Sequence, residues 1–435
     1  MNSFELIIDK IESREARIGV IGLGYVGLPL ALCFSESGFD VCGFESDREK
    51  VGFLERGVSY LRHISDKRIA RALKENMLVT DEYSLASRCD AFIICVPTPL
   101  GKHFEPDLSH VITTLEELTP HLRDGQIICL ESTTYPGTTA EEIVPRVQTS
   151  GFSVGEEIFV VYSPEREDPG NPNYSTATIP KVVGGHTDKC LAVGKLLYST
   201  VINQVVPVSS TQVAELTKLV ENIQRSVNIG LMNELKLVAD KMSLDIFEVI
   251  EAASTKPFGF TPYYPGPGMG GHCIPIDPYY LAWKAQEYGL RTRIIELSGD
   301  INRNMPNFVV QKTLEALNSV GTPMLGSNII ILGVAYKKNV SDIRESPALE
   351  IIKLLLIYGA KVNYCDPFVA SLMPTQSYNW QLANIDLDTA ALNACDACIL
   401  VTDHDAFDYD HIKEQCKLVI DCRGRYNASS NIVRA

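Results

Sequence analysis

The sequence has no hydrophobic run long enough to cross a bilayer. Its longest apolar stretches, AFIICV and NIIILGVA, are far shorter than the roughly 20 residues that a spanning helix needs. The N-terminal stretch MNSFELIIDKIESREAR lacks the charged-then-apolar pattern of a signal peptide and predicts a short amphipathic helix instead. These absences predict a cytoplasmic protein without a membrane partner.

Positive charge is also scarce. The 39 lysines and arginines are outnumbered by 54 aspartates and glutamates, which gives a formal net charge of −15. Nucleic-acid binding relies on basic side chains that neutralise phosphates, so this balance argues against a nucleic-acid partner. It still allows a local basic pocket for one small anionic ligand.

The cysteines are scattered along the chain. Only Cys395 and Cys398, in the stretch CDAC, have the CxxC outline of zinc ligands, and a helix is expected to end there as a strand begins. We therefore expect no metal. Several others, such as Cys33, Cys129 and Cys422, lie in apolar stretches, where cysteine is usually a small buried hydrophobe. A reducing cytosol fits this usage.

Two α/β regions flank a helical one. Short β-rich runs alternate with helical segments at both ends of the chain, which is typical of parallel sheets covered by helices on both faces. The predicted strands are RIGVIGLG, DVCGFE, AFIICVP, QIICLEST, IFVVYSP and PKVVGG, and then NIIILGVAYK, KVNYCDP, ACILVTD and LVIDCRG. The sequence predicts an N-terminal domain (1–207), a central helical domain (208–312) and a C-terminal domain (313–435).

The helical region opens with TQVAELTKLVENIQRSVNIGLMNELKLVADKM, which has no proline and one glycine. Its apolar residues recur at helical spacing and predict one helix of about 30 residues. They are Val213, Leu216, Val220, Ile223, Val227, Leu231 and Leu235. Such a helix could join two lobes, and helices of this kind often form dimer interfaces. Further helices are expected as far as about Asn304.

A dinucleotide site is predicted near the N-terminus, where Gly22, Gly24 and Gly27 form GxGxxG between an apolar strand and a helix. The glycines allow close approach of the backbone to a pyrophosphate, whose charge the helix N-terminus favours. Glu45 ends the next strand, and this context makes the motif specific. Its carboxylate would accept hydrogen bonds from the adenine ribose and repel a 2′-phosphate, so NAD is favoured over NADP. FAD and a ligand-free turn are the alternatives.

Three further loops follow predicted strands. Ligands bind beyond the carboxyl ends of parallel strands, so these loops would face the same crevice. They are CVPTPLG with Thr98, ESTTYPGTT with Glu131, Ser132 and Thr133, and YSPEREDPGN with Glu165 and Arg166. The same residue types also shape turns, so each loop taken alone could be structural.

The stretch PGPGMGGHCIPIDP, residues 265–278, frames a single thiol, Cys273. Oxidation of an alcohol alone needs no thiolate. Oxidation to an acid can use one, which adds to the aldehyde and forms a thioester for hydrolysis. Asp277 could manage a proton nearby, and His272 is expected to be structural. From the residues alone, Cys273 is either this nucleophile or an inert loop cysteine.

Lys218 and Asn222 lie four residues apart on the predicted long helix and so share one face. Beside a catalytic thiol, an ammonium and an amide could stabilise a developing oxyanion. A solvated surface lysine is the competing interpretation of Lys218.

Together these stretches resemble the UDP-glucose/GDP-mannose dehydrogenase family of nucleotide-sugar 6-dehydrogenases over nearly the whole chain. The shared motifs are GLGYVGLPLA, VPTP, EST, SPE, AELTKLVEN, GGHCIPIDP, GVAYKKNVSDIRESPA and DCRG. The resemblance implies an α/β protein with two Rossmann-like domains, joined by a long central helix and a helical dimerisation region, in a homodimer or higher homo-oligomer. It also implies NAD as cofactor, a UDP-sugar as substrate, and four-electron oxidation of the sugar C6 hydroxyl to a carboxylate.

The resemblance assigns roles motif by motif. The implied catalytic residues are Cys273 as nucleophile, Lys218 and Asn222 as oxyanion stabilisers, Asp277 in proton transfer, and Thr133 and Glu165 as holders of the hydrolytic water. The implied cofactor-binding residues are Gly22, Gly24, Tyr25, Val26, Gly27, Glu45, Thr98, Thr133 and Arg344. The implied substrate-binding residues are Glu165, Arg166, Lys218, Asn222, Tyr263, Gly270, Lys337 and Arg423.

The stretches ESTTYPGTT, SPEREDPGN and TKPFGFTPYYPGPGMGGHCIPIDPYYL look most like the UDP-N-acetylglucosamine 6-dehydrogenases of bacterial surface-polysaccharide pathways. UDP-glucose dehydrogenases usually carry NPEFL where this chain has SPERE. They also carry a basic residue in the loop before the glycines, which reaches the substrate across the dimer. That loop here reads STKPFGF, with Lys256 as its cation, so the contact is expected to differ. UDP-GalNAc, UDP-ManNAc and UDP-glucose are the alternative substrates.

Two other classes fit parts of the sequence. A two-electron hydroxyacid dehydrogenase of the 6-phosphogluconate type would share the N-terminal domain and the long helix. It would leave the glycine-framed thiol and the second α/β domain unexplained. A non-catalytic NAD-binding sensor would need neither the thiol nor its partners.

Overall fold

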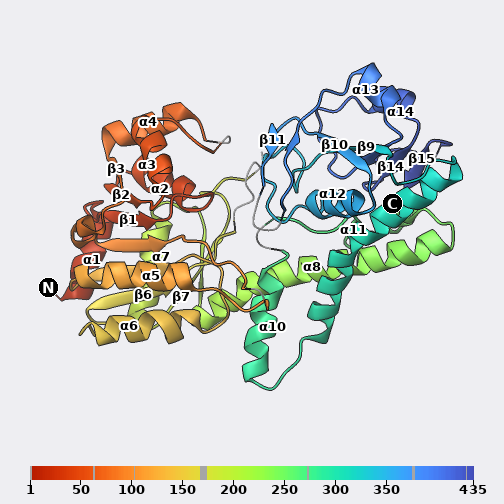
Figure 1. The fold of residues 1–435 in the computed structure, drawn as a ribbon. Coiled ribbons are helices and arrows are strands. Elements are labelled where there is room, and N and C mark those ends of the chain that lie inside the picture. Colours follow the sequence, from red (N-terminus) through yellow and green to blue (C-terminus); the bar gives the residue numbers. More distant parts are fainter. Residues whose placement is uncertain are drawn as a thin grey trace. The chain divides into compact units, whose positions relative to one another are not determined.

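The computed structural model of the protein describes residues 2–61, 64–101, 103–166, 174–271, 274–374, 378–427 and 429–435. The chain divides into two compact units (Figure 1). Unit 1 comprises Met1–Glu221 and Tyr279–Leu290, and unit 2 comprises Asn222–Pro278 and Arg291–Ala435. Cys273 and His272 lie outside the described residues.

Unit 1 is built on a sheet whose described strands follow the order β3-β2-β1-β4-β5-β6-β7-β8, with all neighbours parallel except β6 and β7. The strands are β1 (Ile18–Ile21), β2 (Val41–Phe44), β3 (Met77–Thr80), β4 (Ala91–Ile94), β5 (Gln126–Leu130), β6 (Ile158–Tyr162), β7 (Lys181–Gly185) and β8 (Val205–Val208). The six predicted strands are confirmed. The other two, β3 and β8, are the half-exposed edges of the sheet and carry a weaker apolar signal.

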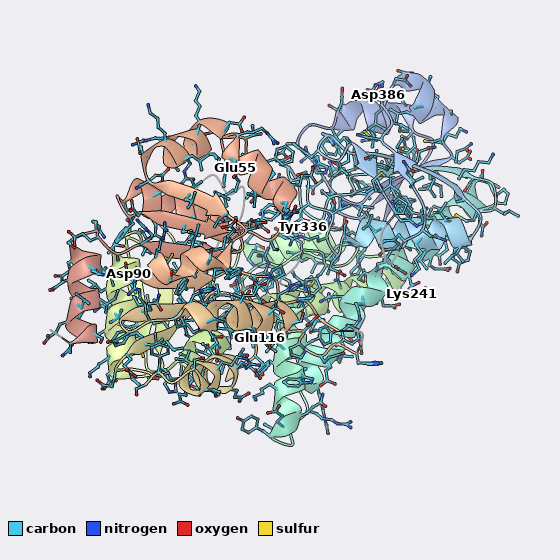
Figure 2. The ribbon with its side chains drawn as sticks, turned by 60° about the vertical axis from the view of Figure 1, so that its left-hand side comes forward. Glu55, Asp90, Glu116, Lys241, Tyr336 and Asp386 are labelled. Carbon is cyan, nitrogen blue, oxygen red and sulfur yellow. The ribbon has the colours of Figure 1, made fainter. Side chains whose placement is uncertain are left out.

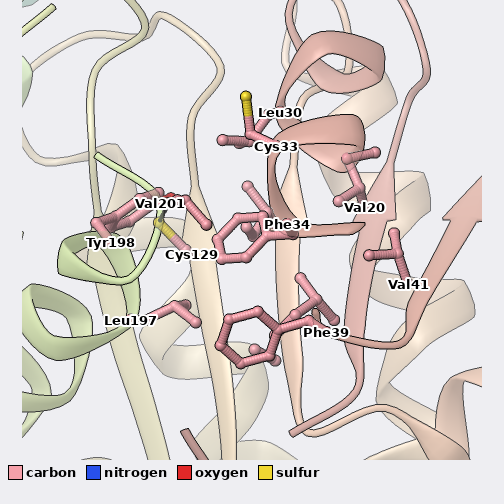
Figure 3. Packing of buried hydrophobic residues seen from close by; sticks show 14 of the residues in the cluster. Val20, Leu30, Cys33, Phe34, Phe39, Val41, Cys129, Leu197, Tyr198 and Val201 are labelled. Atoms are coloured by element: carbon pink, nitrogen blue, oxygen red, sulfur yellow. Dashed lines mark hydrogen bonds between the residues drawn. The ribbon is translucent and has the colours of Figure 1, made fainter. Parts of the chain in front are cut away.

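Helices cover both faces of this sheet, because alternate side chains of each strand point to opposite sides. On β4, Ile93 belongs to one buried cluster and Ile94 to the other. Figure 3 shows part of the first cluster, where Phe34 packs edge to face on Phe39 with ring centroids 5.7 Å apart. The helices are α1 (Ser3–Glu12), α2 (Gly27–Glu36), α3 (Arg48–Glu55), α4 (Asp66–Glu75), η1 (Tyr83–Arg88), α5 (Ser109–Leu118), η2 (Thr119–His121), η3 (Thr139–Ile143), α6 (Val144–Thr149) and α7 (Asp188–Ser199). The predicted N-terminal helix is thus confirmed as α1.

The predicted long helix is confirmed as α8 (Thr211–Lys241), which has 31 residues and continues from unit 1 into unit 2. Five of the seven apolar residues that predicted it are 38% to 53% exposed. They are Val213, Leu216, Val220, Leu231 and Leu235. The stripe therefore forms an apolar face on the surface of the single chain, which we call the α8 face.

Unit 2 contains a second parallel sheet, in the order β10-β9-β13-β14-β15. Its strands are β9 (Asn328–Leu332), β10 (Lys361–Cys365), β13 (Ala397–Leu400), β14 (Val419–Asp421) and β15 (Ile432–Arg434), beside the small pair β11 (Ser371–Leu372) and β12 (Leu382–Ala383). The four strands expected here are confirmed. With unit 1, this confirms the predicted α/β class, with two Rossmann-like sheets and a long central helix.

The helical region extends further than predicted. Helix α11 (Arg293–Ser319) passes through Pro306 instead of ending near Asn304. Beyond the proline, Val309 and Leu317 are buried in the core of the second sheet, and this packing sustains the helix. The remaining helices are α9 (Ile246–Ser254), α10 (Asp277–Glu287), α12 (Pro347–Ile357), α13 (Thr389–Ala394) and α14 (Tyr409–Gln415). Within the described ranges, none of the helices combines the length and apolar character of a membrane span.

Candidate active site

The turn between β1 and α2 has the close geometry that GxGxxG predicts. Gly22 has a φ of +87°, which favours glycine. A Cβ on Gly27 would lie 1.9 Å from the carbonyl oxygen of Gly22, whereas a Cβ on Gly24 would meet nothing within 4 Å. Helix α2 begins at Gly27, and its N-cap residue, Val26, has no polar side chain to occupy the first N–H groups. The close turn and the uncapped start of α2 therefore suit an anion.

Glu45 is placed as a ribose acceptor would be. It lies just beyond β2, is 8% exposed, and accepts hydrogen bonds from the N–H groups of Leu23 and Asp47, at 3.1 Å each. Each carboxylate oxygen holds one of these bonds, so each keeps a lone pair for another donor. The residues present therefore fit a dinucleotide whose ribose carries a free 2′-hydroxyl.

We expect Glu45→Ala to raise KM for NAD about tenfold, which corresponds to about 1.4 kcal/mol of lost hydrogen bonding. It should also narrow the preference for NAD over NADP, because a 2′-phosphate would no longer meet a carboxylate. Steady-state kinetics with both cofactors measures this, and Glu49→Gln, an exposed acid on α3, is the matched control. An unchanged NAD to NADP ratio would remove Glu45 from the role.

The corresponding acid of the second sheet is occupied by its own neighbours. Asp366 follows β10 and is fully buried. One of its oxygens accepts from the N–H groups of Val334 and Ala335, at 2.7 and 3.0 Å, and from Nε2 of His404 at 3.0 Å. Nδ1 of His404 accepts the N–H of Asn339, so Nε2 carries the proton that is donated to Asp366. This carboxylate holds loops together and has little capacity left for a ribose.

Two predicted cofactor residues of unit 1 meet each other. The Thr98 hydroxyl donates to the carbonyl oxygen of Thr133 at 2.6 Å. The neighbouring Thr134 was missed by the motif reading. Its hydroxyl is completely buried and has no hydrogen-bond partner within the described ranges. The side chains of adjacent residues point in different directions, so the sequence does not reveal whether Thr133 or Thr134 points inward.

The other two predicted residues of this loop, Glu131 and Ser132, bond to neighbouring groups of the fold. The carboxylate of Glu131 is buried against Lys181, with Nζ and Oε2 3.0 Å apart, and also accepts from the Tyr198 hydroxyl. Figure 3 shows Tyr198 beside Cys129 in the first core cluster, where its hydroxyl is 3.0 Å from the sulfur. The Ser132 hydroxyl donates to the carbonyl oxygen of Val96, just beyond β4, at 2.6 Å. Neither side chain is directed to the crevice as expected, because a buried carboxylate and hydroxyl need local partners.

Glu165 borders a hollow of about 20 Å³ that Arg166 and Lys181 also line. One water needs roughly 10–15 Å³, so the hollow has room for about one. The guanidinium of Arg166 pairs with Glu221 of α8 at 2.8 Å and donates to the carbonyl oxygen of Pro180 at 2.7 Å. A fixed arginine and a half-buried carboxylate thus flank a water-sized space.

The solvated-lysine interpretation of Lys218 is wrong, because this residue of α8 is only 7% exposed. In unit 2, Asn222 Nδ2 donates to Asp277 Oδ2 at 2.5 Å, so the structure brings these two predicted residues together. Asp277 is 1% exposed and is the first residue of α10, where the helix dipole favours its charge. It had been expected within the glycine-rich loop.

The glycine-rich loop before Cys273 is tightly enclosed within unit 2. A Cβ on Gly270 would lie 2.6 Å from Cβ of Tyr336, which Figure 2 labels. Gly271 has a φ of +84° and donates its N–H to the carbonyl oxygen of Arg344 at 2.9 Å. The Arg344 side chain itself pairs with Asp342 at 2.7 Å. The motif GVAYKKNVSDIRESPA thus shapes the loop through its backbone and Tyr336.

Arg423 faces the same loop with a cation that has no carboxylate partner among the described residues. Its Nε donates to the carbonyl oxygen of Val401 at 2.6 Å, and a Cβ on Gly266 would lie 2.9 Å from Nη1. Burial lowers the pKa of Arg423. A desolvated guanidinium beside bare backbone suits an anionic ligand.

Two further predicted substrate residues are less enclosed. The Tyr263 hydroxyl donates to the side-chain oxygen of Gln224 at 3.0 Å, and Lys337 is half-buried.

The CxxC pair meets a third thiol in unit 2. Sγ of Cys398, in β13, lies 3.5 Å from that of Cys395, at the end of α13, and 3.0 Å from that of Cys416, at the end of α14. Sulfur ligands at about 2.3 Å from one zinc ion stay roughly 3.7 Å apart, and a structural site takes four donors. The group that the described residues form has three. These thiols pack as small hydrophobes within an apolar core.

Comparisons with known proteins identify the family of this chain. Models of the UDP-glucose/GDP-mannose dehydrogenase family match the chain in three segments: the NAD binding domain at residues 16–202, the central domain at 212–304 and the UDP binding domain at 330–428.

Individual relatives match over almost the full length. A UDP-N-acetyl-D-glucosamine 6-dehydrogenase of Salmonella typhi is 35% identical, with 90% of this chain and 91% of the relative covered. A UDP-N-acetyl-D-mannosamine dehydrogenase of Pyrococcus horikoshii is 33% identical, with 90% of each covered. The solved structure of a UDP-D-ManNAc dehydrogenase from Pyrococcus horikoshii has a TM-score of 0.86, 31% identity, and coverage of 95% and 96%. The chain therefore belongs to the UDP-glucose/GDP-mannose dehydrogenase family of NAD-dependent nucleotide-sugar dehydrogenases.

Proposed function

We propose that this protein oxidises the C6 hydroxyl of UDP-GlcNAc to the uronic acid, with two NAD reduced per sugar. The observation that carries the proposal is the burial of Lys218 on α8, because a desolvated ammonium is suited to stabilising an oxyanion. The motif places the glycine-framed Cys273 as its reaction partner.

The chemistry proceeds in four balanced steps. The alcohol loses a hydride and a proton to give an aldehyde, and the Cys273 thiolate adds to the aldehyde carbon to give a thiohemiacetal. Loss of a second hydride gives a thioester, and water releases the carboxylate and regenerates the thiol. Overall, one alcohol, one water and two NAD⁺ give one carboxylate, two NADH and three protons. When bound at the β1–α2 turn, NAD supplies the hydride acceptor.

The chain's own residues hold charge and protons through these steps. Lys218 and Asn222 stabilise the alkoxide that forms at C6. Asp277, fixed by Asn222 at 2.5 Å, exchanges the proton of that oxygen. Glu165 holds the hydrolytic water in its neighbouring hollow, with Thr133 and the unpartnered Thr134 hydroxyl on the loop after β5.

The substrate side is assigned to the C-terminal domain. Arg423 and Lys337 bind the UDP moiety, while Arg166, Tyr263 and the backbone at Gly270 shape the pocket. The 2-acetamido sugar is favoured because relatives named for UDP-N-acetylglucosamine and UDP-N-acetylmannosamine match 90% of the chain. The loop STKPFGF also departs from the UDP-glucose pattern. UDP-ManNAc is the leading alternative, followed by UDP-GalNAc and UDP-glucose.

The proposal includes a homodimer or higher homo-oligomer. The α8 face exposes five large apolar side chains along one helix, and contiguous apolar surface of this kind is usually covered by a partner. Pairing through α8 would bury it. We also propose a cytoplasmic location and a role in supplying uronic acids for surface polysaccharides.

A panel of UDP-GlcNAc, UDP-ManNAc, UDP-GalNAc and UDP-glucose with NAD tests the function. We expect two NADH per sugar consumed, and the highest kcat/KM for UDP-GlcNAc. One NADH per sugar with release of aldehyde would contradict the four-electron reaction. A tenfold or greater preference for UDP-glucose would overturn the substrate assignment. NAD binding with no NADH from any of the four sugars would favour a non-catalytic sensor.

A further inference from the structure

Glu215, on the first turns of α8, is a buried acid that the reaction scheme leaves without a role. It is completely buried. One carboxylate oxygen accepts the N–H of Gly137 at 2.6 Å. The other accepts both the N–H and the hydroxyl of Thr139, at 2.8 and 2.6 Å. All of these residues belong to unit 1.

The partners of Glu215 lie at the end of the loop 131–138, which connects β5 to η3 and carries Thr133 and Thr134. The first N–H groups of a helix need acceptors, which a side chain of the N-cap residue usually supplies. Thr138, at that position, turns its hydroxyl back to the carbonyl oxygen of Tyr135. Glu215 therefore caps η3 from a different element, and ties the loop to α8.

The same stretch of α8 carries Lys218, three residues and about one turn further along. We infer that Glu215 is a positioning residue, which fixes the loop 131–138 relative to Lys218 so that the hydrolytic water and the oxyanion stabiliser share one geometry. This inference rests on the proposed function of Lys218 and of the loop threonines. A second clamp supports it: Glu141 of η3 pairs with Lys284 of α10 at 2.8 Å.

The energetics favour positioning over packing. Burial raises the pKa of Glu215 to about 7, against the three hydrogen bonds that favour its charged form, and the nearby charge of Glu141 acts in the same direction as burial. A buried carboxylate is costly, and a hydrocarbon side chain would fill the same space more favourably. The directed hydrogen bonds to the loop are what a hydrocarbon could not provide.

Glu215→Gln tests the inference, because the amide preserves the shape but sets an N–H group against one of the three donors. We expect kcat to fall about 10- to 100-fold, since small displacements of catalytic groups cost this much. KM for NAD and for UDP-GlcNAc should stay within about threefold, because neither ligand touches Glu215. Thr139→Val, which removes one donor and keeps both backbone bonds, should lower kcat by about threefold. The exposed Glu116 of α5, labelled in Figure 2, gives the control Glu116→Gln, with unchanged kinetics.

Two outcomes would overturn the inference: a Glu215→Gln enzyme with normal kcat, or parallel losses in kcat and in both affinities, as from general unfolding. If Glu215→Gln fails to fold, Thr139→Val decides, and normal kcat in that variant rejects the role. The wild-type NADH stoichiometry separates the two proposals. If it is two per sugar and these variants behave like wild type, only the positioning role fails.

Discussion

Replacing Cys273 with serine should stop the enzyme before the acid is formed. A serine hydroxyl is almost entirely protonated at neutral pH and is a far weaker nucleophile than a thiol, so capture of the aldehyde fails. We expect steady-state uronic acid formation to fall by at least about 10³-fold. Lys218, Asn222 and Asp277 are intact in this variant, so the first oxidation can still occur. A single turnover should therefore give at most one NADH per site.

The measurement combines NADH absorbance with identification of the sugar product by mass. Cys365→Ser is the matched control, because Cys365 is a half-buried free thiol in the same unit, at the end of β10. It should retain normal kinetics. Acid formation at the wild-type rate by Cys273→Ser would remove the thioester from the mechanism, and with it the reason for a four-electron reaction at this loop.

Two alanine substitutions in the GxGxxG turn, one at Gly27 and one at Gly24, should separate cofactor binding from folding. Gly27→Ala places a Cβ 1.9 Å from the backbone oxygen of Gly22, so the turn must move. We expect loss of NAD binding together with a clear drop in Tm. Gly24→Ala places its Cβ in open space. It should fold like the wild type and yet bind NAD about 100-fold more weakly, because the methyl group stands where the pyrophosphate approaches.

Thermal unfolding and calorimetric titration with NAD measure both quantities. Gly38→Ala is not a suitable control, because Gly38 has a φ of +88° and any side chain would be strained there. Ala31→Gly is the better control for the unfolding measurements, because Ala31 lies within α2 and away from the turn. Normal NAD affinity in Gly24→Ala would show that the cofactor does not cross this glycine, even though the motif is present.

Much of the fold could be predicted from the sequence, and the gaps have physical causes. Central strands such as β4 are buried on both faces and read as continuous apolar runs. The edge strands β3 and β8 are half-exposed and carry no such run. The length of α8 followed from spacing alone. The extension of α11 past Pro306 did not, because packing against a distant sheet, and not local propensity, holds that segment helical.

The candidate site shows a similar division. Motif spacing predicted Gly24 and Glu45, and the family resemblance predicted Lys218, because each of these predictions depends on position along one element. Glu215 and Thr134 were missed because their significance lies in where a side chain points after the chain has folded. One ends on the N–H groups of a loop 76 residues away along the chain, and the other ends on no described partner. Neither arrangement can be recognised from the residues that adjoin Glu215 or Thr134 in the sequence.

The occupied carboxylate of Asp366 has a consequence for ligand sorting. A chain with two Rossmann-like sheets carries two places at which a ribose diol could find an acid. In the second sheet that acid is already saturated by four backbone N–H groups, two on each oxygen, and by His404. The cofactor therefore gains little by entering the domain meant for the uridine nucleotide. Two domains of the same fold therefore need not bind the same ligand, if the acid of one domain is already hydrogen-bonded to groups of its own chain.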